Sequence, residues 1–464
     1  MDVTLRMTGR QHQLLQAHLL PADGKEAAAV ALCGRRAGQR VHALTVRQIV
    51  PIPYNECATR ERDLLTWPTA RLVPLLEEAA KRQLAILKIH SHPQGLHSFS
   101  AQDDAADREL FSSVHGWVDD DQPHASAVML PGGEMFGRAV GPADFTSLAS
   151  VSVAGDDIFF WHVDGNDETH PEHSRRNEQA FGRGTVHRLR QLAVAVVGCS
   201  GTGSPVIEQL ARLQVGRLVL VDPDRIEPKN LNRILNATAE DARKKRFKVE
   251  VAARSVAQLG FGTEVDPIPE NLCAPHVVEA VAACDVVFGC MDGAEGRLVL
   301  NRLATFYSLP YFDVGVRLDA DGQGGIDQIA GTVHYLQPGG SSLLSRGVIT
   351  AEEAAADSLR RTNPEEYRAR VQQGYLRGVR EDRPAVLPVN LHYASLAVLE
   401  FLARLHPYRN EANGRFARHG NSLVNADLYY DEDGEPDRPL AREVGRGDVV
   451  PRLDMPALSG SETA

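Results

Sequence analysis

The stretch Leu192–Gly203, LAVAVVGCSGTG, decides the fold of the larger part of this 464-residue chain. Its first six residues are apolar and mostly valine and alanine, which is typical of a strand buried in a parallel sheet. A glycine-rich turn follows at Gly198–Gly203, and the next residues, Pro205–Leu213, have the apolar spacing of a helix. Such a turn directs backbone N–H groups and a helix N-terminus at one point, where they bind an anion such as a phosphate. The stretch therefore predicts a nucleotide-binding domain built on a doubly wound parallel sheet.

The residues after this turn favour a triphosphate over a dinucleotide. A second predicted strand, Arg217–Val221, ends in Asp222, at the spacing where an acidic side chain contacts a ribose hydroxyl. That pattern alone fits NAD and ATP equally. Hydride transfer needs few cations near the phosphates, whereas cleavage of a triphosphate needs several, together with a carboxylate that holds magnesium. Arg233, Lys248 and Asp292 supply such a set, and they favour ATP.

Residues 176–408 resemble the ubiquitin-activating-enzyme-like superfamily (ThiF/MoeB/HesA). The Gly-x-Gly-Gly-x-Gly turn of that family is matched by Gly198–Gly203, where Ser200 replaces the second glycine. The other family positions are matched by Arg176, Asp222, Asp224, Asn230, Arg233, Lys245, Lys248 and Asp292. The resemblance implies a Rossmann-like fold, ATP and Mg²⁺ as cofactors, and a homodimer formed through this domain.

The resemblance also implies a role for each matched residue. Those implied to bind the nucleotide are Gly198, Ser200, Gly201, Gly203, Asp222, Asp224, Asn230, Arg233, Lys248 and Arg176. Asp222 is implied to bind the ribose, Arg233 and Lys248 to act in catalysis on the triphosphate, and Asp292 to hold Mg²⁺. In relatives, the arginine matched by Arg176 reaches the nucleotide of the dimer partner. The implied reaction is attack by a C-terminal glycine carboxylate on the α-phosphate, which gives an acyl-adenylate and pyrophosphate.

Two departures from the family pattern concern cysteines. Relatives often carry paired zinc-binding cysteines after a Pro-Gly-Gly turn, but Pro338–Ser345 contains serines instead, and no cysteine follows Cys290. We therefore expect no structural zinc in this domain. The nucleophilic cysteine of some relatives is also missing, and Cys199 in the turn is best interpreted as a small residue needed for close packing. The adenylate is then expected to pass directly to an external thiol.

A His-Ser-His motif is the centre of the N-terminal part of the chain. The preceding residues Leu84–Ile89, LAILKI, predict a short buried strand. Side chains alternate along a strand, so His90 and His92 point the same way and can bind one ion. Ser100 is a candidate helix N-cap, and Asp103 three residues later adds a carboxylate. Two imidazoles and one carboxylate leave a fourth position open, as in catalytic zinc sites.

The spacing His-x-His-x7-Ser-x2-Asp resembles the motif of the JAB/MPN (JAMM) metallopeptidases. Some members are zinc isopeptidases that cut after the C-terminal glycines of ubiquitin-like proteins. The family also carries a glutamate where an early apolar strand begins, and Glu26 before Ala27–Gly34 is the best match. Glu56 and Glu61 are rivals, but they lie in a polar connector.

This second resemblance implies that zinc is held by His90, His92 and Asp103. Glu26 is then the general base that takes a proton from the attacking water, and Ser100 supports the oxyanion. The residue types fit this chemistry, because zinc activates water and polarises the scissile carbonyl, while a carboxylate can pass the proton to the leaving amine.

The two motifs divide the chain into four parts. Residues 1–163 are expected to form an α+β JAB/JAMM zinc metallopeptidase domain, and residues 164–175 a polar linker. Residues 176–410 are expected to form a ThiF-type adenylation domain, followed by a polar extension, 411–464, that is disordered from about Arg446. The predicted fold class is an α/β multidomain protein, with a JAB/MPN domain followed by a Rossmann-like one.

Composition excludes several classes of protein. Hydrophobic residues make up 43% and charged residues 24%, as in ordinary globular domains. The formal net charge of −11 argues against a general binder of nucleic acid or anionic membranes. The first residues lack the apolar segment of a signal peptide, no apolar run is long enough to span a bilayer, and the six cysteines show no disulfide spacing. We expect a cytoplasmic protein.

Together the motifs predict a bifunctional enzyme of a bacterial ubiquitin-like protein system. One site cleaves after the C-terminal glycine of a ubiquitin-like protein. The other adenylates that terminus for transfer to an external thiol, such as that of a conjugating enzyme or a sulfurtransferase. Three alternatives stay open: processing and activation of a sulfur-carrier protein for biosynthesis, a non-catalytic scaffold with degenerate sites, and an NAD-dependent oxidoreductase that rests only on the glycine-rich turn.

Overall fold

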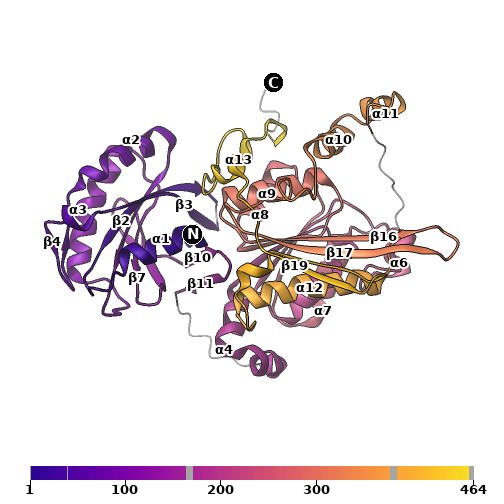
Figure 1. Cartoon of the computed structure of the whole chain (residues 1–464), viewed down its shortest axis with the longest axis horizontal. Helices are drawn as coiled ribbons and strands as arrows, with labels where there is room; N and C mark the ends of the chain where they lie inside the picture. The colour runs from indigo at the N-terminus through magenta and orange to yellow at the C-terminus, as the bar shows by residue number, and fades with distance from the viewer. Residues whose placement is uncertain (1, 39, 164–170, 377–383, 459–464) are drawn as a thin grey trace. The chain divides into compact units, whose positions relative to one another are not determined.

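The structure is a computed structural model that describes residues 2–38, 40–163, 171–376 and 384–458 (Figure 1). These residues form two compact units. One contains the described residues up to Val163 together with Thr305–Ser308 and Glu443–Val449, and the other contains the remainder. None of the described helices is both long and apolar enough to cross a membrane.

The first unit is an α+β domain, and its residues up to Val163 are drawn in indigo to purple in Figure 1. Its strands are β1 (Asp2–Thr8), β2 (Ala28–Arg36), β3 (Val41–Pro51), β4 (Thr59–Arg60), β5 (Leu65–Thr66), β6 (Ala85–Ser91), β7 (His124–Met129), β8 (Met135–Val140), β9 (Phe145–Ser147), β10 (Ser150–Ala154) and β11 (Ile158–His162). Its helices are α1 (Gly9–Leu19), α2 (Val73–Arg82) and α3 (Ala101–Val118).

A nine-stranded mixed sheet, in the order β11-β10-β1-β3-β2-β6-β7-β8-β9, divides this unit into two cores. Alternate residues of β2 show the division, since Ala29 and Ala31 lie in one core and Val30 and Leu32 in the other. Helix α1 packs on the first face, and helices α2 and α3 pack on the second. Because both faces of the central strands are covered, most residues of β2 and β6 are buried, including the polar Lys88 and His90.

The C-terminal segment Glu443–Val449 belongs to this first unit, which differs from the disorder expected from about Arg446. The Gly34 N–H of β2 donates to the Gly445 carbonyl at 3.2 Å, and a Cβ added at Gly34 would lie 2.3 Å from that oxygen. The segment is polar, so its composition indicated disorder. Its order comes from backbone pairing with β2, which composition does not register. Residues 459–464 lie outside the described residues.

The second unit is a doubly wound α/β domain, as predicted. Its strands are β12 (Ala193–Val197), β13 (Arg217–Val221), β14 (Glu264–Ile268), β15 (Val286–Gly289), β16 (Tyr311–Ala320), β17 (Ile326–Leu336), β18 (Arg418–Ser422) and β19 (Asp427–Asp431). Its helices are α4 (Arg175–Gln191), α5 (Gly203–Arg212), α6 (Ala239–Arg243), α7 (Lys248–Leu259), α8 (Pro275–Ala282), α9 (Ala294–Phe306), α10 (Ala351–Thr362), α11 (Pro364–Gln372), α12 (Leu387–Leu405) and α13 (Arg438–Ala441).

The sheet of this unit has the order β14-β13-β12-β15-β16-β17-β18-β19. The strands from β14 to β16 are parallel, and β17, β18 and β19 continue the sheet antiparallel. Strands β18 and β19 lie within residues 411–464, so part of that polar stretch completes the sheet. Of the expected linker, 164–175, the described end includes the 3-10 turn Glu172–Ser174.

Aromatic packing fixes the long helix α12 against the parallel strands. Phe288 of β15 and Phe312 of β16 stack with ring centroids 5.0 Å apart. Phe401 of α12 meets both rings edge-on, at 5.9 and 5.8 Å. The apolar sequence expected to pack as a helix on the sheet does so through these rings.

Close backbone contacts determine the turn between β12 and α5. Gly198 has a φ of +92°, and a Cβ added there would lie 2.6 Å from the Cys290 carbonyl oxygen. A Cβ added at Gly203 would lie 1.7 Å from the Gly198 carbonyl oxygen. No side chain fits against backbone at these distances, so both positions require glycine.

We expect Gly203→Ala to lower the free energy of unfolding by about 1–3 kcal/mol or more, the usual cost of overpacking a tight site. The added methyl group meets a backbone oxygen that cannot rotate away. Gly184→Ala in α4 is the matched control, because a Cβ there has open space. Thermal unfolding of the two variants measures the difference, and equal midpoints would contradict this account of the turn.

Candidate functional site

The glycine-rich turn and three strand ends meet at one edge of the second sheet. Val197, Val221 and Gly289 end β12, β13 and β15, and they are partners across these parallel pairs. The Gly198 N–H donates to the Val221 carbonyl at 2.8 Å, and the Cys290 N–H donates to the Val197 carbonyl at 2.8 Å. Open α/β sheets bind ligands at this carboxyl edge. We call it the nucleotide edge.

Asp222 is the buried carboxylate of the nucleotide edge. Its Oδ2 accepts the Cys199 N–H at 2.8 Å, and its Oδ1 accepts the Asp224 N–H at 2.9 Å. Lys248 Nζ lies 3.7 Å from Asp222 Oδ1 and 2.7 Å from Asp224 Oδ2. Burial raises the pKa of Asp222, while the Lys248 ammonium group and the two N–H donors favour its charged form. The structure therefore brings three of the predicted residues together beside the turn.

Three more predicted residues lie near the same edge in different environments. Asn230 is buried, and its Oδ1 accepts the Glu227 N–H at 3.0 Å, which closes a short 3-10 turn. Arg233 lies beside Gly201, because a Cβ added at Gly201 would be 3.2 Å from Arg233 Cδ. Asp292 follows the end of β15 and is exposed to solvent.

Arg176 is not brought to the nucleotide edge of its own unit. It is exposed in the first turn of α4, where its Nη1 donates to Gln179 at 3.0 Å. Gly182, which follows Arg176 by six residues, has a φ of +77° and interrupts the helix.

Asn390, in the first turn of α12, also lies at the nucleotide edge and was not predicted from the sequence. Asn390 is 5% exposed, and a Cβ added at Gly201 would lie 2.2 Å from its Nδ2. The available signal was an amide in the first turn of a largely apolar helix.

Serines and acids fasten the loop that follows β17, where relatives carry cysteines. Arg346 Nη2 donates to Asp433 Oδ1 at 2.9 Å, and its Nε donates to Ser341 Oγ at 2.7 Å. Ser342 Oγ donates to Asp437 Oδ2 at 2.5 Å. This charged hydrogen-bond network ties the loop to residues near β19.

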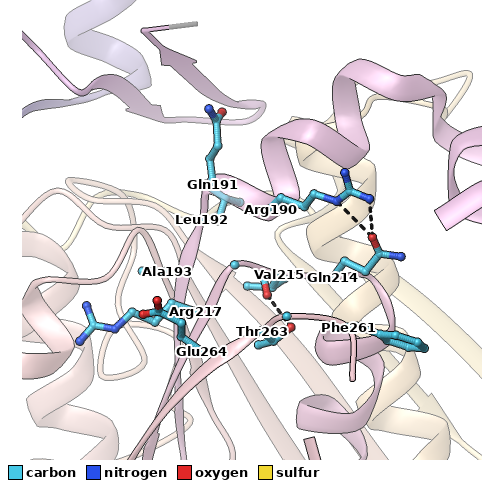
Figure 2. A pocket seen from close by; sticks show the side chains of 12 residues that line it. Arg190, Gln191, Leu192, Ala193, Gln214, Val215, Arg217, Phe261, Thr263 and Glu264 are labelled. Atoms are coloured by element: carbon cyan, nitrogen blue, oxygen red, sulfur yellow. Dashed lines mark hydrogen bonds between the residues drawn. The ribbon is translucent and has the colours of Figure 1, made fainter. Parts of the chain in front are cut away.

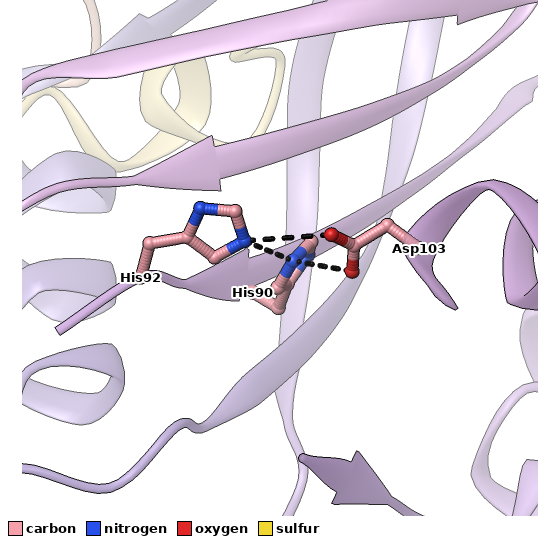
Figure 3. A group of neighbouring side chains, drawn as sticks. All are labelled: His90, His92 and Asp103. Atoms are coloured by element: carbon pink, nitrogen blue, oxygen red, sulfur yellow. Dashed lines mark hydrogen bonds and ion pairs between the residues drawn. The ribbon is translucent and has the colours of Figure 1, made fainter. Parts of the chain in front are cut away.

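In the first unit, His90, His92 and Asp103 converge as the sequence predicted (Figure 3). The two Nε2 atoms are 3.1 Å apart, and the Asp103 oxygens lie 3.0 Å from His90 Nε2 and 3.6 Å from His92 Nε2. Both imidazoles are buried. His92 Nδ1 lies 2.8 Å from the Leu96 carbonyl, so it carries the proton there and leaves the Nε2 lone pair for a metal. The donor set and its spacing fit a zinc ion.

Ser100 holds Asp103 in place at the start of α3. Its Oγ donates to Asp103 Oδ2 at 2.7 Å and accepts the Asp103 N–H at 3.1 Å, which forms a capping box. The hydroxyl is thus engaged with a predicted metal ligand in this structure. Its predicted contact with an oxyanion stays a prediction.

Glu26 lies beside the cluster at the start of β2. Ala28, two residues on, pairs with His90 across β2 and β6. Burial raises the pKa of Glu26 to about 7, with the charges of His92 and Asp103 acting in opposite directions. A carboxyl group that titrates near neutral pH is suited to accept and return a proton.

The rival glutamates have other partners. Glu56 forms an ion pair with Arg71, and the exposed Glu61 pairs with Lys25 at 3.6 Å. The Glu61 carbonyl accepts the Glu26 N–H at 2.8 Å, so its role here is to hold the backbone of Glu26. The geometry favours Glu26 among the three.

A second cluster in the described residues, His115, Asp120 and His124, fits a metal poorly. His124 Nδ1 accepts the Ile86 N–H at 2.9 Å, so the ring proton lies on Nε2 and no lone pair is left there. Burial lowers the pKa of His124 to about 2, and Arg35 nearby adds to the effect. A buried cation beside the ring further opposes a metal ion.

A hollow at the opposite edge of the second sheet is separate from the nucleotide edge (Figure 2). Ala193, Arg217 and Glu264 line it, and each is the first residue of a parallel strand. Arg190 on its wall donates to Gln214 at 3.1 and 2.8 Å. Because ligands of such sheets bind at the carboxyl ends of the strands, we assign no part of the predicted activity to this hollow.

The fold and the two sites define a Rossmann-type nucleotide-binding protein that also carries a JAB-type domain. Residues 173–427, more than half of the chain, match the model of the ThiF family. Residues 10–138 match the model of prokaryotic homologs of the JAB domain. The chain belongs to the ThiF family, and the predicted fusion of a JAB domain with a ThiF domain is confirmed.

Individual relatives share shorter segments. Ubiquitin-like modifier-activating enzyme 5 of Culex quinquefasciatus is 29% identical over 164 residues, which cover 33% of this chain and 38% of that protein. The SAMP-activating enzyme E1 of Haloferax volcanii is 37% identical over 123 residues, which cover 26% of this chain and 45% of that protein. The crystal structure of E. coli MccB with ATP is 18% identical with a TM-score of 0.43, and the match covers 59% of this chain and 74% of that one. The chain spans less than half the length of these two curated relatives.

A buried ion network holds the helix that carries Asp103. Lys88 precedes His90 by two residues on β6, and Asp107 follows Asp103 by one turn on α3. Lys88 Nζ donates to Asp107 Oδ1 at 2.6 Å, and Arg138 Nη2 donates to Asp107 Oδ2 at 2.7 Å. All three side chains are buried. Helix α3 is therefore held against β6 by two pairings, one between Lys88 and Asp107 and one between His90 and Asp103.

We expect Asp107→Asn to destabilise the first unit by about 3–5 kcal/mol, because it leaves the buried Lys88 facing a neutral amide and Arg138 paired only with Asp104. Glu109→Gln makes the same chemical change at an exposed position of α3 and is the matched control. Chemical denaturation of the full chain measures both variants. Equal stability of the two would show that the network does not hold the helix.

Proposed function

We propose that this chain is a bifunctional enzyme of a bacterial ubiquitin-like protein system. One site cleaves after the C-terminal glycine of a ubiquitin-like protein, and the other adenylates that terminus for transfer to an external thiol. The observation that carries the proposal is the presence, on one chain, of a ThiF nucleotide edge and a JAB domain with a converged His-His-Asp cluster. The names of two relatives, a ubiquitin-like modifier-activating enzyme and a SAMP-activating enzyme, support a small protein modifier as the substrate.

Adenylation uses the charges of the nucleotide edge. The N–H groups of the turn Gly198–Gly203 and the start of α5 receive phosphate, and Asp222 keeps one lone pair on each oxygen for the ribose hydroxyls. The substrate carboxylate attacks the α-phosphorus, and pyrophosphate leaves. Arg233 and Lys248 stabilise the negative charge that develops on the leaving group. Asp292, exposed at the end of β15, would hold Mg²⁺, which neutralises phosphate charge when bound.

The cysteines of the chain support transfer to an external thiol. None of the six forms a disulfide, and five are buried. Burial raises the pKa of Cys199 well above its ordinary value and raises that of Cys273 to about 12. Thiols in such surroundings are protonated near neutral pH and are poor nucleophiles.

The exposed position of Arg176 supports a homodimer. Arg176 makes no contact with the nucleotide edge of its own unit among the described residues, and its side chain is solvent-accessible. A role on the triphosphate therefore requires that it act on the nucleotide of a partner subunit.

Peptide cleavage uses the first unit. His90, His92 and Asp103 would hold zinc, which polarises the scissile carbonyl and activates water when bound. Glu26 accepts a proton from the attacking water and returns it to the leaving amine, for which a pKa near neutral is suitable. Ser100 supports the oxyanion and keeps Asp103 in position.

The first test concerns Glu26. We expect Glu26→Gln to slow cleavage at least about 100-fold, the usual contribution of a general base, while zinc binding is retained. The assay incubates the full chain with a ubiquitin-like precursor that extends beyond its terminal glycine and measures the intact mass of that precursor. Glu61→Gln, at a rival position, is the control and should cleave normally. Wild-type cleavage by Glu26→Gln would remove Glu26 from the mechanism.

The second test concerns Asp292. We expect Asp292→Asn to reduce ATP–pyrophosphate exchange roughly 100-fold, because a lost magnesium ligand costs several kcal/mol of charge stabilisation. Asp319→Asn, on the exposed part of β16, makes the same change away from the edge. Exchange by the full chain with ATP, Mg²⁺ and the ubiquitin-like protein measures both. An Asp292 variant that exchanges like the control would contradict the magnesium assignment.

A further inference from the structure

Asn390 lies in the first turn of α12 and faces the phosphate turn. A Cβ added at Gly201 would lie 2.2 Å from Asn390 Nδ2 and 3.2 Å from Arg233 Cδ. The amide of Asn390 and the side chain of Arg233 therefore flank the same glycine, although they come from distant parts of the sequence. Neither family motif in the sequence includes Asn390.

Asn390 differs from the other buried asparagines of the described residues in its side-chain hydrogen bonding. The other four are Asn230, Asn301, Asn413 and Asn421, and each makes a side-chain hydrogen bond. Asn390 is as buried as these, with 5% exposure, yet its amide makes no hydrogen bond to the described residues. The amide atoms of Asn390 are not among the enclosed, unsatisfied polar atoms of the described residues, so they remain open to solvent and can receive a ligand.

The surroundings of this amide favour an anion. The first N–H groups of α12 follow Val386, whose side chain provides no cap, and Asn390 lies within this turn. Helix α5 also begins at the phosphate turn, at Gly203. Asn390 Nδ2 therefore lies at the start of α12, beside Gly201, which precedes the start of α5 by two residues and also contacts the Arg233 side chain.

We propose that Asn390 is a further binding residue of the adenylation site, and that its Nδ2–H donates a hydrogen bond to a phosphate oxygen of the bound nucleotide. The inference rests on the proposed adenylation activity and adds a contact from α12 to it. A phosphate oxygen would take the place of solvent beside this amide, which makes no side-chain hydrogen bond to the described residues. A side chain at Gly201 would push this amide aside.

The test measures nucleotide binding by the full chain with Mg²⁺, by calorimetry, for Asn390→Ala and Asn390→Asp. Loss of a hydrogen bond to a charged group predicts a Kd for ATP that is roughly 10- to 100-fold higher for Asn390→Ala. Asn390→Asp should weaken ATP binding more, because a carboxylate repels the phosphate. Binding of adenosine, which has no phosphate, should be unchanged in both variants.

Asn236→Asp is the matched control, since it makes the same change at an exposed site of the same unit. Thermal unfolding identifies variants that fail to fold. If Asn390→Ala or Asn390→Asp fails to fold, Asn390→Ser is measured in its place. If a folded Asn390 variant binds ATP as the wild type does, or loses adenosine and ATP equally, the inference is overturned. If the wild-type chain binds no ATP, the proposed adenylation activity itself fails.

Discussion

The buried carboxylate of Asp222 is the interaction on which the larger unit depends. It accepts the Cys199 and Asp224 N–H groups, so it joins the turn after β12 to the end of β13. Removed from water, it needs these donors and the nearby Lys248 ammonium group to remain charged. The turn also requires glycines, because its backbone passes close to Cys290 at the end of β15 and because Gly203 lies against the Gly198 carbonyl.

The JAB unit also contains a buried carboxylate that depends on partners within the protein. Asp107 is fully buried and is bonded to Lys88 and Arg138, so its charge is balanced within the protein. The cluster of His90, His92 and Asp103 lies next to this network. Its nitrogen and oxygen atoms converge on one point, where a metal ion would balance the charge of Asp103. A structural ion network and a candidate metal site thus share one helix and one strand.

Local patterns predicted most of the fold and much of each site. The apolar run Leu84–Ile89 predicted a strand, and β6 extends it through Ser91, which places His90 on the strand itself. The helix expected after Ser100 starts there because Ser100 and Asp103 form its capping box. Composition was a weaker guide, since the polar residues after 410 supply β18 and β19 and the segment that pairs with β2.

The sequence by itself determined the order of the two domains, the turn Gly198–Gly203 and the spacing of the His-His-Asp motif. These depend on short-range geometry: alternation along a strand, the helix start and the absence of a side chain at glycine. Only the tertiary structure decided that Asn390 reaches Gly201, that Lys88 and Arg138 share Asp107, and that Arg176 lies away from its own nucleotide edge. Those contacts join residues that are far apart in the sequence, and packing alone brings them together.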